Sequence, residues 1–255
     1  MHAQLSVTKV PAITFLFWVI KIFSTTLGET GGDALSMTLG LGYILSTLIF
    51  SLLFIVLVNL QINLKQFNVY IYWSTIVATT TVGTTLADFV DRSLGIGYLG
   101  GTSVLLTGLF TVLFVWYRTE KSLSVNQIKT KRSEWFYWIT IIFSQTLGTA
   151  LGDWTADTIG LGFSNGSILF GLLLLGLAIF YKFTRLSHVF LFWATFVLTR
   201  PFGAVLGDFL DKPKNLGGLA LDRIQLSSVL IVSMILLIIA QKNFQKIIGL
   251  YNNKH

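Results

Sequence analysis

Long apolar segments separated by short polar connections dominate the pattern of this chain. The segments around residues 43–60 and 167–181, taken with their flanks, are about as long as the ~20-residue helix that crosses a ~30 Å hydrocarbon core. In lipid, only helices and closed barrels satisfy their own backbone hydrogen bonds. The pattern therefore predicts an all-α membrane protein with about eight transmembrane helices.

A four-fold internal repeat organises these segments. Each copy has a tryptophan, a glycine ten residues later and an aspartate five residues further on. A Gly-Leu/Ile-Gly-aromatic motif follows in the first three copies, whereas the fourth has Asn-Leu-Gly-Gly at 215–218. Such self-similarity indicates tandem repeats of one structural unit. The repeated positions are Trp18, Trp73, Trp138 and Trp193; Gly28, Gly83, Gly148 and Gly203; and Asp33, Asp88, Asp153 and Asp208.

Each copy is predicted to form a helix that ends near the aspartate, a glycine-rich bend and a second helix. The expected repeats cover approximately residues 10–62, 66–118, 133–182 and 187–241, within a single integral membrane domain over residues 1–255. Because two spans return the chain to its starting side, the four copies should be parallel repeats related by an axis along the membrane normal. The four aspartates would then lie at one depth.

Small residues recur at four-residue spacing around each repeat glycine, as in Ser24, Gly28 and Gly32 of the first copy. This spacing lets helix backbones approach closely in lipid, where no hydrophobic force pulls helices together. We therefore expect the first helices to form an inner ring with the repeat glycines at the helix contacts. The second helices should face lipid, and the repeat tryptophans should be interfacial anchors.

Charge is sparse and lies mainly in the connections. Only 11% of the residues are charged, against about 25% in a typical soluble domain, and the net charge is +7. The basic residues lie mostly in the segment 118–134, in other connections and near the termini, which argues against a nucleic-acid surface. The positive-inside rule then predicts that both termini are cytoplasmic.

Several kinds of chemistry find no support in the residue inventory. The chain has no cysteine, and its three histidines, His2, His188 and His255, lie near the ends or in a connection. No nucleophile-base arrangement, phosphate-binding loop or metalloprotease motif occurs. We therefore expect neither an enzyme nor a bound cofactor.

Most of the acidic residues form pairs at i+3 or i+4, so both members lie on one helical face. A ring of such carboxylates would bind a hard divalent cation through oxygen, or bind and release protons. The alternative is that the aspartates only cap the glycine-rich bends. The candidate ion-binding or coupling pairs are Glu29/Asp33, Asp88/Asp91, Asp153/Asp157 and Asp208/Asp211. The expected metal ligands are Glu29, Asp33, Asp88, Asp153 and Asp208.

Glu29 is the acid predicted to lie deepest. It follows Trp18 by eleven residues, which places it about 16 Å along the helix, near the bilayer midplane. Intramembrane ionisable groups are costly and are functional candidates. Lys21 and Arg200 are predicted on the cytoplasmic half of their helices as intramembrane charge partners. Pairing of either one with Glu29 is as well supported as a gating or coupling role.

The W-x9-G-x4-D register resembles that of a bacterial family of uncharacterised membrane proteins with four tandem repeats. Each repeat in that family has two transmembrane segments and a tryptophan. The resemblance extends from Val10 to about Ala240. It implies the fold and a membrane location, and it implies no established activity.

Two functions from different classes fit these patterns. The first is a membrane transporter of cations, with divalent metal ions as substrate, driven by proton exchange or by the ion gradient. The second is a non-transporting membrane scaffold or sensor whose basic segment 118–134 binds anionic lipid or a partner. The expected partners are the lipid bilayer and a small cation, without nucleic acid. The sequence leaves the oligomeric state open.

Overall fold

The structure, a computed structural model, describes residues 9–64 and 66–252, with side chains as far as residue 243. The ends of the chain, 1–8 and 253–255, whose sidedness the charge pattern predicts, lie outside the described residues. All regular structure in the described part is helical. The α-helices are α1 (Phe15–Asp33), α2 (Gly42–Asn63), α3 (Val69–Asp88), α4 (Tyr98–Glu120), α5 (Lys131–Asp153), α6 (Gly162–Phe183), α7 (His188–Asp211) and α8 (Arg223–Asn252).

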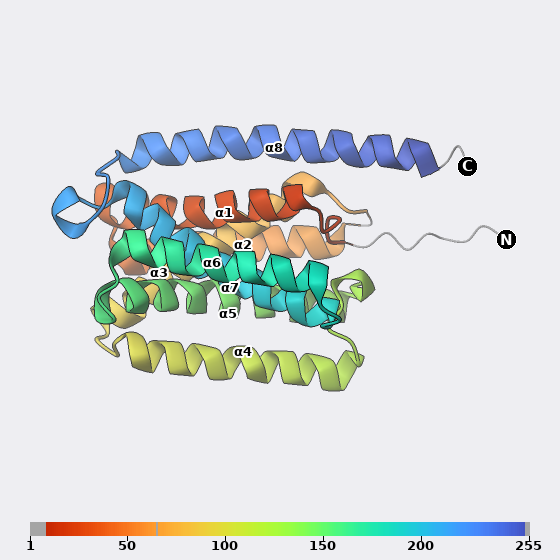
Figure 1. Ribbon diagram of the computed structural model, residues 1–255, viewed down its shortest axis with the longest axis horizontal. Helices are drawn as coiled ribbons and strands as arrows, with labels where there is room; N and C mark the ends of the chain where they lie inside the picture. Colours follow the sequence, from red (N-terminus) through yellow and green to blue (C-terminus); the bar gives the residue numbers. More distant parts are fainter. Residues whose placement is uncertain (1–8, 65, 253–255) are drawn as a thin grey trace.

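The first helices of the four repeats form a closed inner ring. α3 and α7 each contact both α1 and α5, so α1, α3, α5 and α7 surround a common axis. This arrangement agrees with the ring that the small-residue stripe predicts. All eight helices run roughly along one direction, and α1 begins at the end of the bundle where α8 ends (Figure 1).

The second helices lie outside this ring, each displaced by one repeat. α2 packs on α3, α4 on α5, α6 on α7 and α8 on α1. Their outward faces expose large apolar side chains, such as Leu52, Phe110, Leu172 and Leu236. The outer surface is therefore suited to lipid, as the sequence predicts.

Within the described residues, five helices are long and apolar enough to cross a membrane: α2, α4, α6, α7 and α8 up to Asn243. The remaining three, α1, α3 and α5, belong to the inner ring. They carry many serine and threonine residues, which are buried against neighbouring helices.

The first three repeats turn from the inner to the outer helix in the same way. Each inner helix ends at the repeat aspartate and continues into one π-helical turn, at Ala34–Thr38, Phe89–Ser93 and Trp154–Thr158. Two glycines with positive φ follow, such as Gly40 (φ 70°) and Gly42 (φ 73°), in the left-handed region that glycine adopts without strain. In the fourth repeat, α7 instead runs on to Asp211 before a 3₁₀ turn at Lys214–Leu216.

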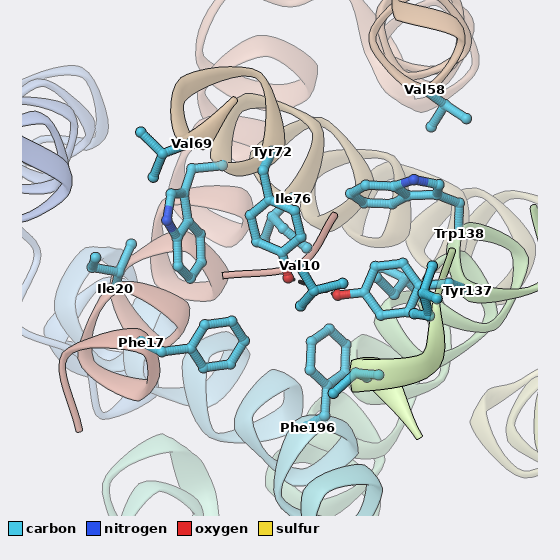
Figure 2. Close-up of a cluster of buried hydrophobic side chains, with 14 of the residues drawn as sticks. Val10, Phe17, Ile20, Val58, Val69, Tyr72, Ile76, Tyr137, Trp138 and Phe196 are labelled. Carbon is cyan, nitrogen blue, oxygen red and sulfur yellow. Dashed lines mark hydrogen bonds between the residues drawn. The ribbon is translucent and has the colours of Figure 1, made fainter. Parts of the chain in front are cut away.

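Aromatic side chains fill the ring at the end where the inner helices begin. Phe17, Tyr72, Tyr137 and Phe196 surround Val10 (Figure 2), and the Tyr72 and Tyr137 hydroxyls are 2.6 Å apart in a hydrogen bond. The N-terminal segment is held across this end by Lys9, whose ammonium contacts a Glu134 carboxylate oxygen at 2.7 Å. We call this the aromatic end.

The expectation that the repeat tryptophans anchor the protein at the membrane interface is wrong for three of them. Trp73, Trp138 and Trp193 are buried inside the bundle, and only Trp18 is partly exposed. For two of them, the physical reason is that protein atoms satisfy the indole N–H group. Trp73 Nε1 donates to the Gln241 side chain, and Trp193 Nε1 donates to the Leu123 carbonyl oxygen.

Candidate functional site

The centre of the ring holds an ion pair between Glu29 of α1 and Arg200 of α7. Arg200 Nη2 donates to Glu29 Oε2 over 2.9 Å, and the arginine side chain has no exposed surface. Arg200 is thus one of the two basic residues that the sequence offers as partner for Glu29. The pair joins two helices that are adjacent in the ring and far apart in the sequence.

Two threonines complete the layer around this pair. The guanidinium of Arg200 also donates to the hydroxyl oxygens of Thr84 in α3 and Thr149 in α5. Thr84 in turn donates to Glu29 Oε2. All four inner helices therefore contribute a side chain to one hydrogen-bonded layer.

Lys21, the other basic residue predicted at this depth, does not contact Glu29. Its ammonium nitrogen lies 4.3 Å from the centroid of the Phe196 ring, in a cation–π contact, and its side chain is fully buried. Among the described residues, the Lys21 ammonium has no hydrogen-bond partner. The same holds for Ser144 Oγ and for both polar atoms of the Gln145 side chain, all from inner helices.

The repeat glycines lie where neighbouring inner helices touch. A β-carbon at Gly28 would collide with Thr80, and one at Gly148 would collide with Arg200. Gly83 and Gly203 stand in the same relation to the next helix, facing Gln145 and Thr25. Each repeat glycine therefore meets a polar residue that lies seven positions after the tryptophan of the next repeat around the ring. These residues are Thr80, Gln145, Arg200 and Thr25.

Three carboxylates converge beyond the central layer, toward the end where the inner helices finish, which we call the acidic end. Glu29, Asp33 and Asp208 each have an oxygen within 4.8 Å of the others, and all three residues are buried. Glu29 and Asp33 lie one turn apart on α1, while Asp208 faces them from α7. Carboxylate oxygens at this separation can ligate one hard cation.

A lysine side chain already places a cation in this cluster. Lys212 Nζ lies 2.5 Å from Asp33 Oδ2 and 3.0 Å from Asp208 Oδ1. Lys212 follows the end of α7. Burial lowers the pKa of Lys212, but the neighbouring carboxylates raise it by more, so the net pKa lies above the ordinary lysine value. The side chain therefore remains an ammonium.

Arg223, at the start of α8, is the second cation of this cluster. It contacts Asp211 Oδ2 through Nε at 2.8 Å and approaches Asp33 Oδ2 at 3.6 Å. Asp33, Asp208 and Asp211 thus share two cations, Lys212 and Arg223. With these groups in their ordinary charged forms, the cluster carries one excess negative charge.

The aspartates of the second and third repeats belong to a different cluster. Arg92 Nε lies 2.9 Å from Asp88 Oδ1, and Arg92 Nη2 lies 3.7 Å from Asp153 Oδ2. The four repeat aspartates therefore do not form one open acidic ring, as the sequence pattern suggested. Basic side chains divide them into two ion-paired clusters.

The remaining two predicted acids lie outside these ion-paired clusters. Asp157 accepts a hydrogen bond from the Tyr98 hydroxyl over 3.1 Å, in an exposed position. Asp91 Oδ1 is buried and has no hydrogen-bond partner among the described residues. Neither residue belongs to the group of three carboxylates.

Sequence reasoning missed the threonines of the central layer, although the repeat contains a signal for them. Thr84 and Thr149 follow their tryptophans by eleven residues, as Glu29 follows Trp18. The helix ring brings these equivalent positions to one depth. Arg200 reaches the same layer from a position one turn earlier on its own helix.

The sequence also contains a partial signal for the basic side chains at the acidic end. Arg92 and Lys212 each lie four residues after a repeat aspartate, at the i, i+4 spacing of a helical ion pair. The contacts that join two repeats, such as Arg92 with Asp153, have no such signal because they depend on the packing of separate helices.

These features describe a helical repeat protein with a buried polar axis and an apolar outer surface that suits a membrane. The chain belongs to the family of the Repeat of Unknown Function (DUF347), whose model matches four tandem segments. The matched residues are 16–66, 71–122, 136–187 and 191–246. No significant match was found among curated proteins or among solved structures.

Proposed function

We propose that this protein is a membrane transporter of cations and that Glu29, Asp33 and Asp208 bind the transported ion. The observation that carries the proposal is the convergence of these three buried carboxylates within 4.8 Å, with a lysine ammonium already held between two of them. A group that binds an ammonium in this way presents its oxygens and its charge to a cation.

Charge balance favours a divalent metal ion as the substrate. Asp33, Asp208 and Asp211 face two cationic side chains, which leaves one excess negative charge. If a divalent ion displaces the ammonium of Lys212, the cluster becomes neutral. Oxygen ligands suit hard ions such as Mg²⁺, Ca²⁺ and Mn²⁺.

Lys212 acts in this proposal as a tethered competitor of the ion. When the ion binds, the ammonium moves out of the cluster, and when the ion leaves, the ammonium returns. Buried carboxylates would otherwise face a large penalty without a counter-ion. Protons that bind the carboxylates when the ion leaves would also neutralise their charge. Transport would then be coupled to protons, and an imposed pH gradient tests this coupling.

Buried polar groups of the inner helices that have no hydrogen-bond partner among the described residues support a path toward the aromatic end. Buried polar atoms normally have hydrogen-bond partners, and ordered water supplies the partner where protein does not. The unpaired atoms of Lys21, Ser144 and Gln145 therefore favour a hydrated stretch of the axis. The aromatic side chains beyond it would form the gate at that end.

We further propose that all eight helices cross the bacterial cytoplasmic (inner) membrane, with both termini in the cytoplasm. α1, α3 and α5 run alongside the five helices that are apolar enough to span, which supports a membrane-spanning position for these three as well. The basic segment 118–134 lies at the aromatic end, which would then be the cytoplasmic end.

Transport of radioactive Mn²⁺ into vesicles containing the purified protein tests the proposal. Asp208→Asn and Glu29→Gln should each reduce initial uptake by at least tenfold, because each removes one carboxylate of the group of three. Asp153→Asn is the matched control, since Asp153 holds the same repeat position as Asp208 but pairs with Arg92. It should keep more than half of the uptake.

The proposal fails if Mn²⁺, Mg²⁺ and Ca²⁺ all cross vesicles with and without the protein at the same rate. It also fails if Asp208→Asn and Asp153→Asn lose uptake equally. Repeating the uptake with and without an imposed pH gradient reports the coupling to protons.

A non-transporting scaffold or sensor is the second candidate, and closure of the axis at both ends favours it. Aromatic side chains fill one end, and ion pairs close the other. In that case, the basic segment 118–134 would recruit anionic lipid or a partner. Binding of the protein to anionic vesicles, lost when Lys129, Lys131 and Arg132 are neutralised, without any ion flux, would support this function.

A further inference from the structure

A groove opens on the side of the bundle between α6 and α1, with α7 as its floor. Its volume is about 820 Å³. The segment after α4 borders it near the aromatic end. The lining is predominantly apolar along the helices and includes Trp18, Ile22, Leu174, Leu177, Ala178 and Phe192.

The outer helices around the groove do not all pack in the same way. α2 contacts the inner helix α5 as well as α3, and α8 contacts α3 as well as α1. α6 makes no comparably close contact with α1. Trp18 lines the groove and is partly exposed, whereas its three counterparts in the other repeats are buried.

The groove has the length of one membrane leaflet. Its lining follows α7 from His188 to Thr199, which is eleven positions further on, or about 16 Å along the helix. Half of a ~30 Å hydrocarbon core is about 15 Å. α6 and α7 are both among the helices apolar enough to span. An acyl chain entering at the His188 end would therefore reach the middle of the bilayer at Thr199.

The two ends of the groove differ in polarity. Ser124, Asn126 and His188 line the end at the aromatic end of the bundle, whereas Thr199 is the lining residue furthest from it along α7. Three basic residues flank the polar mouth in the sequence, Lys121 next to the segment after α4, and Lys182 and Arg185 next to Tyr181 and His188. All three are exposed, and none of the described residues that line the groove is acidic.

We propose that this groove binds an anionic glycerophospholipid, with an acyl chain along α7 and the headgroup phosphate at the basic mouth. The apolar lining matches the acyl chain, and the basic mouth attracts the phosphate, since each Lys or Arg near an anionic lipid surface contributes about 1 kcal/mol. The inference requires a membrane location but does not depend on transport activity.

The bound lipid would touch the helix that organises the ring. Thr199 lies in the groove and directly precedes Arg200, which holds Glu29. Pro201 follows and cannot donate a backbone hydrogen bond to the preceding turn of α7. A lipid in the groove therefore supports α7 where its own backbone bonding is interrupted.

Tryptophan quenching by brominated lipids tests the proposal. The purified full chain is placed in phosphatidylcholine vesicles containing a small fraction of brominated phosphatidylglycerol or, in parallel, the same fraction of brominated phosphatidylcholine. We expect quenching by the anionic lipid to exceed that by the zwitterionic lipid at least twofold. The excess should disappear in Trp18→Phe, which identifies the reporting side chain.

Two further variants locate the lipid. Ala178→Phe fills the groove and should abolish the excess quenching, whereas Ile179→Phe is the control, since Ile179 is exposed on the same helix outside the lining. The double variant Lys182→Gln/Arg185→Gln leaves the groove open and should remove the preference for the anionic lipid. It keeps the test decisive if Ala178→Phe does not fold.

Three results would overturn the proposal. Equal quenching by the two lipids would mean that the groove has no preference for an anionic headgroup. Excess quenching that survives in the double variant would place the anionic lipid elsewhere. Protection of Trp18 from both lipids would mean that protein, such as a second copy of this chain, covers the groove.

Discussion

Replacing Glu29 by leucine should destabilise the protein more than replacing both members of its ion pair with Arg200. The single change leaves a guanidinium with no exposed surface and without its carboxylate partner. Breaking a buried pair by removing one partner costs about 3–5 kcal/mol. We therefore expect Glu29→Leu to lower the free energy of unfolding by an amount in this range.

The double variant Glu29→Leu/Arg200→Met should recover most of this loss. Replacing a buried pair by apolar side chains of similar volume is often neutral, because the cost of burying both charges is removed as well. Thr84 and Thr149 then lose the arginine as donor, but their hydroxyls can still donate to carbonyl oxygens one turn back, those of Thr80 and Gln145. We expect a net change within about 1–2 kcal/mol of the unmodified protein.

The measurement is equilibrium unfolding in detergent, followed by the loss of helical circular dichroism as denaturant is added. Glu120→Leu is the control, because Glu120 lies at the partly exposed end of α4. A cost below about 1 kcal/mol for Glu29→Leu, the range of an exposed pair, would refute the reasoning. A double variant less stable than Glu29→Leu would also contradict it, because the remaining charge would then not be the source of the loss.

Three other predictions follow from the packing and from the charge pattern. Gly148→Leu should destabilise the protein by about 1–3 kcal/mol or prevent assembly, since Arg200 occupies the space, whereas Gly176→Leu on α6 should be tolerated; detergent stability and yield compare them. Tyr72→Phe should lower the free energy of unfolding by about 1–3 kcal/mol, because the buried Tyr137 hydroxyl loses its hydrogen-bond partner; thermal unfolding in detergent measures this. A cytoplasmic reporter fused after Lys254 should be active; activity of a periplasmic reporter there instead would reverse the proposed orientation.

Most of the fold could be predicted from the repeated spacing of tryptophan, glycine and aspartate. Glycines that recur with the tryptophans give the same contact in every copy, so four equivalent helices meet around an axis. The apolar second helices follow because a side chain without polar groups is stable against lipid. The sequence could not show that each outer helix packs on the following repeat, since a repeat looks the same whichever neighbour it contacts.

The acidic residues of the candidate site could be predicted from the sequence, whereas the contacts of its basic residues could be predicted only in part. Glu29 and Asp33 lie on one helical face, and the repeat places Asp208 at the same depth as Asp33. The contact of Arg223 with Asp211 depends on how the chain folds back between α7 and α8, which no periodicity encodes. Trp73 shows the opposite difficulty, because an indole beside a membrane surface and an indole buried against Gln241 have the same local sequence signal.

The packing of α8 on α1 has a consequence for biosynthesis. Among the described helices, α1 is synthesised first, and α8, which covers it, is synthesised last. The polar residues of α1 must therefore remain in the insertion machinery, or be covered temporarily, until α8 arrives. Because α1 begins near the point where α8 ends, a circularly permuted chain that starts at α3 and joins α8 to α1 through a short linker would remove this delay. Its yield compared with that of the natural order would show whether late closure limits production.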